Sequence, residues 1–483
     1  MSRRFIRRFV CILLLLFAGS ILAAEEPLPT AQEWRTHLES DLMRFWMTPE
    51  AIGVDGNFPT YRCNDGSLFN AAKPCRELTE PARGIVYLDR DYLRMQSRQV
   101  YGYGVAYHVT GEEKYLEQLR KGAQWMMRNG FEQIDGALVP VSFWRNGKAM
   151  PRPPQRTSQD AAYSLTGLGF YYVITRDPEA LRYVKAVKDY IFTTYWDNGQ
   201  RIIRWVNEPF MDETADRWEL TAQLDQVYAY MIWLTPALPV ADQEPWKKDL
   251  IRLAHVMKDV FYAGDCGSRP NPACGLFWGD GTRGHFRAVG QNHTDYGHSV
   301  KTMWMIYTVG KRYGDRELEE FGRRGALQIL EWAYDRQAGS WLRAPGDAGR
   351  EWWAMCELDQ TAGSLGLENP AHARYLASTF RWYRTKMVDQ KYGEVWHLTS
   401  PDGTPDLALP KQHGWKSNMH STEHALVGYI TASQMYAQPV TLHFAWASKP
   451  DERTVKPYVY EGTVSKVVEI RTGRQAVTFT NLR

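Results

Sequence analysis

Two histidines stand at matching places in the chain, each at the predicted start of an apolar helix. His298 follows a glycine in Tyr296-Gly297-His298, and His420 closes the polar run Asn418-Met419-His420. An imidazole titrates near neutral pH, so it can take and return a proton without much tuning of its surroundings. A lone histidine is often a core residue, but two at equivalent positions favour a shared catalytic site.

The predicted starts of the other apolar helices also carry ionisable side chains. These are Arg98, Asp160, Asp225, Glu357 and Asp359. If all these helices begin at the same end of the fold, their first turns converge on one cavity. Structural roles remain open for the aspartates: Asp160 could cap or neutralise a helix N-terminus, and Asp225 and Asp359, each in a Leu-Asp-Gln triplet, could anchor neighbouring helices.

A repeated pair of helices supplies the elements that position these residues. Residues 91–108 are rich in small, aromatic and aliphatic side chains, whereas residues 112–128 carry one apolar stripe and a charged face. A helix that is apolar nearly all round must be buried, and a helix with one stripe lies outside it. The same pairing is predicted at 158–175 with 178–194, 221–235 with 243–262, 294–313 with 316–334, and 352–365 with 371–388.

Two further helices, 31–46 and 420–436, complete about six pairs. Thr30 is a suitable N-cap for the first of them. A bundle or an open solenoid would also show repeated pairs, but inner helices this apolar favour closure into a ring. The sequence therefore predicts an all-α (α/α)6 toroid over residues 25–437, followed by a small β appendage at 438–483 whose Val- and Thr-rich runs 464–470 and 476–480 are typical of strands.

Several motifs occur in a familiar order. Gln96-Ser97-Arg98 precedes Tyr101 and the Thr110-Gly111 turn, Gly297-His298 precedes Trp304, Arg350-Glu351-Trp352-Trp353 leads to Glu357, and Trp415-Lys416 precedes His420. Together, from about residue 33 to 430, they resemble the N-acylglucosamine 2-epimerase superfamily, which includes cellobiose 2-epimerases and aldose-ketose isomerases.

The resemblance implies a role for each matching residue. His298 and His420 would be the acid and base that move a proton at C2 of an open-chain sugar through an enediolate, and Arg98 would stabilise the oxygen. Together with the other helix starts and the aromatic residues, these motifs give the expected substrate-binding residues: Asp160, Asp225, Glu357, Asp359, Trp352, Trp353, Trp396 and Trp415. Bases on both faces of C2 give epimerisation, whereas one base acting between C1 and C2 gives isomerisation.

The chain departs from the family pattern at three positions. Asp225 stands where a third histidine is usual, Lys301 where a glutamate is usual, and Glu423 where an arginine is usual. The charges at the last two positions are reversed: position 301 has a base where an acid is usual, and position 423 has an acid where a base is usual. If their side chains meet, the exchange preserves an ion pair while altering the electric field at both histidines.

The N-terminus is predicted to be an export signal. Residues 1–24 combine four arginines, an apolar run and a small-residue end, which predicts a periplasmic or secreted protein without a membrane anchor after cleavage. In an oxidising compartment, disulfides between Cys63 and Cys75 and between Cys266 and Cys274 are expected. Cys356, between a tryptophan-rich segment and a glutamate, is interpreted as a packed thiol.

The composition limits the classes of molecule that the protein is expected to bind. The net charge is +3 with both signs interspersed, which gives no nucleic-acid footprint, while 19 Trp and 27 Tyr are typical of a surface that binds sugar rings. No nucleotide or metal motif occurs, so no cofactor is expected, and the oligomeric state is left open.

Two other functions compete with a sugar epimerase or isomerase. An exported glycoside hydrolase or polysaccharide lyase would use two carboxylates from Asp160, Asp225, Glu357 and Asp359. A non-catalytic glycan-binding component would use its tryptophans alone, among them Trp144 and Trp278.

Overall fold

The structure is a computed structural model and describes residues 26–79, 84–211, 214, 216–265, 273–282, 285–286 and 293–483. The predicted signal at 1–24 and Cys266 lie outside the described residues. Within the described ranges no helix is long and apolar enough to cross a membrane.

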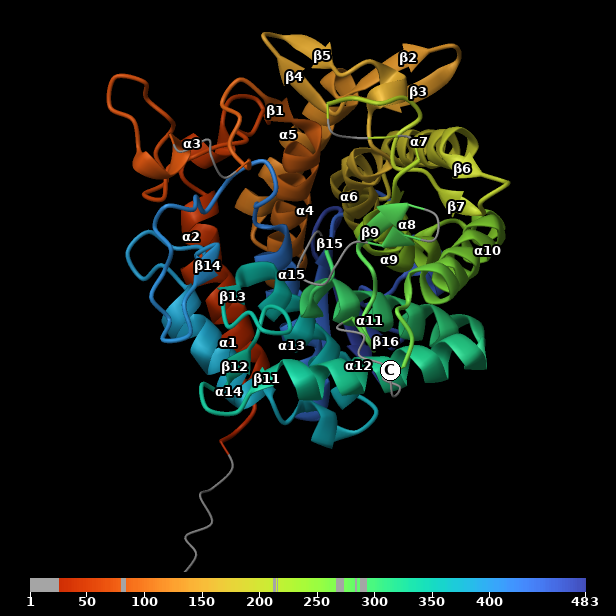
Figure 1. The fold of residues 1–483 in the computed structure, drawn as a ribbon. Coiled ribbons are helices and arrows are strands. Elements are labelled where there is room, and N and C mark those ends of the chain that lie inside the picture. The colour runs from red at the N-terminus through yellow and green to blue at the C-terminus, as the bar shows by residue number, and fades with distance from the viewer. Residues whose placement is uncertain are drawn as a thin grey trace, which may run out of the picture.

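The described helices form a double ring seen nearly along its axis in Figure 1. The inner ring is made of α4 (Leu93–Thr110), α6 (Ser158–Thr175), α8 (Leu220–Gln226) with η5 (Val227–Met231) and α9 (Ile232–Leu234), α11 (Tyr296–Tyr313), α13 (Trp352–Gly366) and α15 (Met419–Met435). The outer ring is made of α1 (Ala31–Thr36), η1 (His37–Leu42) and α2 (Met43–Trp46), then α5 (Glu113–Asn129), α7 (Pro178–Thr194), α10 (Val240–Val256) with η7 (Met257–Phe261), α12 (Arg316–Ala333), and α14 (Leu376–Trp382) with η9 (Tyr383–Met387).

Burial explains the two layers. Every residue of α6 is buried, whereas α5 buries mainly the stripe that includes Leu116, Leu119 and Met126 and exposes its charged face. The ring closes where α15 packs against α4 and α1 packs against α15. Trp34 of α1 lies so close to Gly428 of α15 that an added Cβ would come within 2.3 Å of the indole. The predicted (α/α)6 toroid is confirmed.

Helix boundaries agree with the sequence to within a few residues. The predicted cap of the first helix is present, because the Thr30 side chain accepts a hydrogen bond from the backbone N–H of Glu33. The Glu33 side chain in turn accepts a hydrogen bond from the backbone N–H of Thr30. The main difference is in four segments, η1, η5, η7 and η9, which are π-helical turns continuing α-helices. Short helices occur at α3 (Pro49–Ile52), η2 (Arg76–Leu78), η4 (Pro153–Gln155), η6 (Thr235–Ala237), η8 (Pro370–Ala373) and η10 (Glu452–Thr454).

Short antiparallel strands, which the sequence did not predict, connect outer helices to the next inner helices. They are β1 (Asp91–Tyr92) with β4 (Phe143–Arg145) and β5 (Lys148–Met150), β2 (Phe131–Ile134) with β3 (Ala137–Pro140), β6 (Trp196–Asp197) with β7 (Ile202–Ile203), β8 (Trp218–Glu219) with β9 (Asp280–Thr282) and β10 (His285–Phe286), β11 (Tyr334–Asp335) with β12 (Ser340–Trp341), and β13 (Arg350–Glu351) with β14 (Leu398–Thr399).

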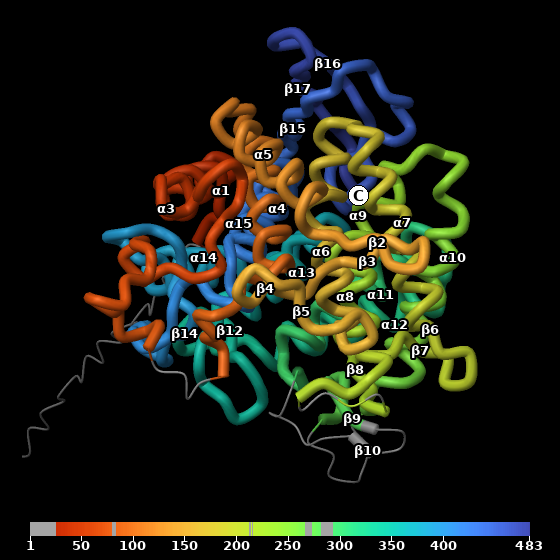
Figure 2. Tube along the Cα trace, turned by 90° about the horizontal axis from the view of Figure 1, so that it is seen from above, coloured from red at the N-terminus to blue at the C-terminus, as the bar shows by residue number. Residues whose placement is uncertain are grey.

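A three-stranded sheet follows the last helix. Its order is β15 (Val440–Phe444), β17 (Arg474–Thr480), β16 (Thr463–Arg471), with antiparallel pairing throughout. β15 packs against α4 and α6. In Figure 2 this sheet lies at one end of the ring, and strands β8 to β10 lie at the other.

Candidate active site

The first turns of the inner helices surround one polar cavity of about 1000 Å³. Of the residues predicted to converge, Arg98, Asp225, His298 and His420 line this cavity. Trp352, Trp353 and Trp415, which were expected to bind substrate, line it as well. The remaining lining residues are Ile85, Gln159, Tyr163, Trp205, Arg217, Glu219, His293, Thr294, Asp295, Lys301, Arg343, Ala344, Pro345, Gly346, Asp347, Glu351, His397 and His413. A cavity of this size is at the upper end of the usual range for small-molecule sites.

His298 is held by the residue that caps its own helix. Asp295 is the N-cap of α11, and one of its oxygens accepts a hydrogen bond from the backbone N–H of His298 at 2.7 Å. The other oxygen lies 2.7 Å from Nδ1 of the His298 ring. Burial lowers the pKa of His298, although Asp295 partly opposes this effect. The ring is therefore neutral near pH 7, with Nδ1 occupied and Nε2 without a hydrogen bond to the described residues.

His420 is held by a different set of groups. Its Nδ1 lies 3.1 Å from Oε1 of Glu357 and 3.2 Å from the Tyr228 hydroxyl. Nζ of Lys301 lies 3.3 Å from the same Glu357 oxygen. Burial lowers the pKa of His420 to about 4, so this ring is also neutral near pH 7. Its Nε2 forms no hydrogen bond with the described residues, so each of the two histidines has one free ring nitrogen.

The buried pair beneath His420 is charged. Burial acts to raise the pKa of Glu357, but the positive charge of Lys301 and the contact with His420 hold it below its usual value. In return, burial acts to lower the pKa of Lys301, and Glu357 raises it above its usual value. Both side chains are at most 3% exposed, so the attraction between them is weakly screened.

Arg98 carries a positive charge into the cavity. Its Nη1 donates to the backbone oxygen of Trp415 at 2.7 Å, and its guanidinium stacks 3.7 Å from the centre of the Tyr163 ring. It forms no ion pair with the described residues, and its buried Nε is unpaired. A guanidinium in this state is available to an oxyanion.

Aromatic rings form the walls between these groups. The Trp353 ring lies 4.3 Å from that of His298 and 6.1 Å from that of His420, so it lies next to both histidines. Trp415, 38% exposed, covers Arg94 at 3.7 Å. Such surfaces suit the apolar C–H face of a sugar ring.

Four of the predicted substrate-binding residues lie outside the cavity lining. Asp160 pairs with Arg94 at 2.7 Å, while Thr157 caps the helix. Asp359 accepts from Trp341 and Thr379 and contacts Nε2 of His424 at 2.9 Å. Glu357 lies beneath His420, and the Trp396 ring packs against Lys411. The interhelical anchoring considered for Asp359 is what the structure shows.

Asp225 lines the cavity but is fully engaged by its neighbours. It accepts from Nε2 of Gln159 at 2.7 Å and from the Tyr163 hydroxyl at 3.0 Å. Two donors on α6 therefore fix a carboxylate on α8, and Tyr163 in turn lies against Arg98.

The ion pair between Lys301 and Glu423, considered for the case that their side chains meet, is not found among the described residues. Lys301 pairs with Glu357, whereas Glu423 accepts hydrogen bonds from the hydroxyls of Tyr228 and Tyr458. Burial and the charge of Glu357 raise the pKa of Glu423 to about 8. The two departures from the family pattern thus have separate partners in this chain.

Several cavity residues were missed by the sequence analysis. His397 and His413 form a stacked pair with Nδ1 and Nε2 2.9 Å apart, and His293 lies 3.6 Å from buried Glu219. Asp295 could have been found, because an aspartate three residues before His298 fits an N-cap. His293, His397 and His413 come from loops between helices, where the helical repeat gives no signal.

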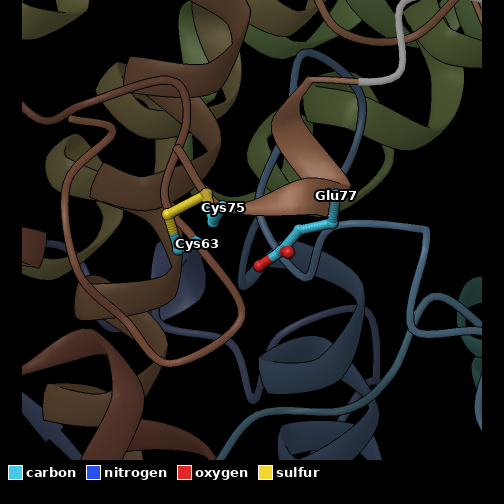
Figure 3. A group of neighbouring side chains, drawn as sticks. All are labelled: Cys63, Cys75 and Glu77. Carbon is cyan, nitrogen blue, oxygen red and sulfur yellow. A yellow bond between two sulfur atoms is a disulfide. The ribbon is translucent and has the colours of Figure 1, made fainter. Parts of the chain in front are cut away.

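Within the described ranges, two groups of side chains come close enough to resemble metal sites. Glu357, His420 and Glu423 place ligand atoms within 4.8 Å of one another, but the Lys301 ammonium already supplies a positive charge there. The other group is Cys63, Cys75 and Glu77, shown in Figure 3, where the two sulfurs form the predicted disulfide and so offer no thiolate. The Glu77 carboxylate accepts from the backbone N–H of Asn64 instead.

The remaining cysteines are partly assigned. Cys274 is disulfide-bonded, but its predicted partner Cys266 lies outside the described residues. Cys356 is buried 3.2 Å from the Tyr383 hydroxyl, and burial raises its pKa, which agrees with a packed thiol.

The fold and the cavity define an (α/α)6 toroid with two neutral histidines at one end of its axis, beside an arginine that forms no ion pair with the described residues. Solved structures with this fold include cellobiose 2-epimerase from Bacillus thermoamylovorans B4167, with 18% identity over 83% of this chain and 98% of that one and a TM-score of 0.65. D-mannose isomerase shows 15% identity, 83% and 97% coverage and a TM-score of 0.64.

A more distant likeness is to the GH76A alpha-1,6-mannanase from Salegentibacter sp. HEL1_6, with 12% identity, 84% and 99% coverage and a TM-score of 0.53. No protein-family model matches the chain, and no curated protein matches it. At these identities the likeness shows the fold, and function must be argued from the site.

Proposed function

We propose that the protein is a carbohydrate epimerase or isomerase that moves a proton at C2 of a sugar or oligosaccharide. The observation that carries the proposal is that His298 and His420 line one cavity, are neutral near pH 7, and each have an Nε2 that forms no hydrogen bond within the described part of the chain. The shared fold with cellobiose 2-epimerase and D-mannose isomerase supports it.

The chemistry follows from the groups present. Nε2 of one histidine takes the proton from C2 while the carbonyl at C1 becomes an enediolate oxygen, and Arg98 stabilises the negative charge. Return of a proton to C2 from the opposite face gives the epimer; the second histidine donates this proton from Nε2 after taking it from water, and the first histidine releases the C2 proton to water. Return of the proton to C1, with transfer of the O2 hydroxyl proton to O1, gives the ketose. The carboxylates beside each Nδ1, Asp295 and Glu357, stabilise the imidazolium formed in between.

The carboxylates support a hydrolase less well than the two histidines support an epimerase or isomerase. Among the four candidates, Asp160 and Asp359 are bonded away from the cavity, and Glu357 is paired with Lys301. Asp225 does face the cavity, but two donors fix it. A hydrolase needs a proton donor and a second carboxylate opposed across the bond.

The test is a proton NMR time course in deuterated water with glucose, mannose, cellobiose and mannobiose. We expect deuterium to enter at C2 together with a new epimer or ketose, and His298→Gln and His420→Gln each to lower the rate by at least about 1000-fold. His255→Gln is the matched control, because His255 bonds Asp315 in the outer ring. New reducing ends without exchange, or full activity of His420→Gln, would contradict the proposal.

A further inference from the structure

The segment between β15 and β16 crosses the end of the ring opposite the cavity, as Figure 2 shows for its flanking strands. It is attached to the ends of inner helices: the Ala445 N–H donates to the Ile174 oxygen at 2.8 Å, and Arg176 donates to the Thr454 oxygen at 2.7 Å. Tyr460 bonds Ser364 at 2.7 Å. The segment is therefore packed onto the toroid, not suspended from it.

Tyr458 extends from this segment into the axis of the ring. It is 4% exposed, and its ring lies 6.2 Å from Phe170 and 6.3 Å from Trp233. Its φ of 62° is in the left-handed region, which is uncommon for a residue other than glycine. Surrounding contacts hold this conformation, and it directs the hydroxyl toward α15.

The hydroxyl begins a chain of contacts that ends at His420. It accepts from Tyr101 at 2.9 Å and donates to Oε1 of Glu423, which lies three residues after His420 on α15. Oε2 of Glu423 accepts from Tyr228, whose ring is stacked on His420. The Tyr228 hydroxyl is 3.2 Å from Nδ1 of His420.

We propose that Tyr458 is a positioning residue for His420, acting through Glu423 and Tyr228. This inference rests on the proposed function, and it gives the C-terminal segment a role in the active site. Tyr458 does not line the cavity. Its hydroxyl fixes one carboxyl oxygen, which leaves the other to orient Tyr228 and, through it, the ring that takes the proton.

Charged and titratable groups from four helical elements face Glu423: Tyr101 on α4, Tyr228 on η5, Lys301 on α11, and Glu357 on α13. His420 on its own helix and Tyr458 and Tyr460 of the C-terminal segment complete the set. Burial and the charge of Glu357 raise the pKa of Glu423 to about 8, and the two tyrosine hydroxyls oppose this rise. Removing the Tyr458 hydroxyl leaves the anion with one donor, so the pH at which Glu423 ionises rises.

The test compares Tyr458→Phe with Tyr460→Phe, a tyrosine of the same segment whose hydroxyl bonds Ser364 and not Glu423. We expect Tyr458→Phe to lower kcat about tenfold with little change in KM, and to move upward by about one pH unit the step that ionisation of Glu423 gives to the kcat profile near pH 8. Tyr460→Phe should change neither. Equal profiles for the two variants would overturn the proposal.

A second readout does not depend on activity. In protein labelled with 15N-histidine, the His420 ring signal is assigned by its absence from His420→Gln, and its shift is followed with pH. We expect a step at about pH 8 that moves upward in Tyr458→Phe and disappears in Glu423→Gln. If this step behaves as expected while no variant turns over any sugar, the proposed function fails and the positioning role stands. An unchanged step in both variants would refute the role.

Discussion

Replacing Lys301 by methionine tests the buried ion pair beneath His420. Nζ of Lys301 lies 3.3 Å from Oε1 of Glu357, and at an effective dielectric constant of about 20 that separation corresponds to roughly 5 kcal/mol of attraction. Both side chains are almost completely buried. Removing the lysine leaves an unpaired buried carboxylate, which typically costs about 3 to 5 kcal/mol.

The free-energy cost of Lys301→Met can be expressed as a change in the melting temperature Tm. Unfolding entropy is about 2.1 cal/mol/K per residue, which for a chain of 483 residues gives about 1 kcal/mol/K. Lys301→Met is therefore expected to lower Tm by about 4 °C in a thermal scan followed by circular dichroism. The double variant Lys301→Met/Glu357→Gln should be about 3 kcal/mol more stable than the sum of the single effects, since neither charge is left alone.

The matched control is the exposed pair between Lys121 and Glu117, in which the side chains are 47% and 57% exposed. Lys121→Met should change Tm by less than about 1 °C, because exposed pairs contribute little. A coupling energy between Lys301 and Glu357 below about 1 kcal/mol would refute the reasoning, since the buried pair would then behave like the exposed one.

Three further outcomes are expected. Replacing Cys63 and Cys75 by serine should lower the free energy of unfolding by about 3 kcal/mol in a denaturant titration, because the disulfide closes a loop with a sequence separation of 12. Asp160→Asn should lower Tm by about 3 °C, because it leaves buried Arg94 without a counter-ion, yet leave KM within about twofold; a large rise in KM would place Asp160 in the binding site. As the pH is lowered, the rate of C2 deuterium exchange should fall with a midpoint near pH 4, because burial lowers the pKa of His420 to about 4 and only the neutral ring takes a proton. A midpoint at pH 6.5, the ordinary value for histidine, would contradict this prediction.

The fold was largely predictable because its signal is local and repeated. The sequence distinguishes helices that are apolar nearly all round from helices with one apolar stripe, and this contrast identified the inner and outer helices. In the structure α6 is buried on all sides, while α5 buries one stripe. The π-helical turns such as η1 left no comparable pattern, since they depend on how a helix packs against its neighbours.

The site was predictable only in part. Inner helices that begin at one end bring their first turns together, so the common cavity of Arg98, His298 and His420 followed from the architecture. Whether each carboxylate faces the cavity could not be predicted, because this depends on a partner elsewhere in the chain: Asp160 pairs with Arg94, and Asp359 pairs with His424. Spacing along one helix carries no information about such pairs.

Closure of the ring by α1 and α15 has a consequence for the folding pathway. Trp34 packs against Gly428, so the first helix of the toroid completes its core only with the last one. The entropy lost on closing so long a loop grows only logarithmically with its length, so the finished protein loses little stability to it. Rates are affected more strongly, because contacts of high sequence separation form slowly. The apolar side of α1 therefore lacks its native partner while the intervening pairs assemble, and burial of the Trp34 indole is expected to be among the last events of folding.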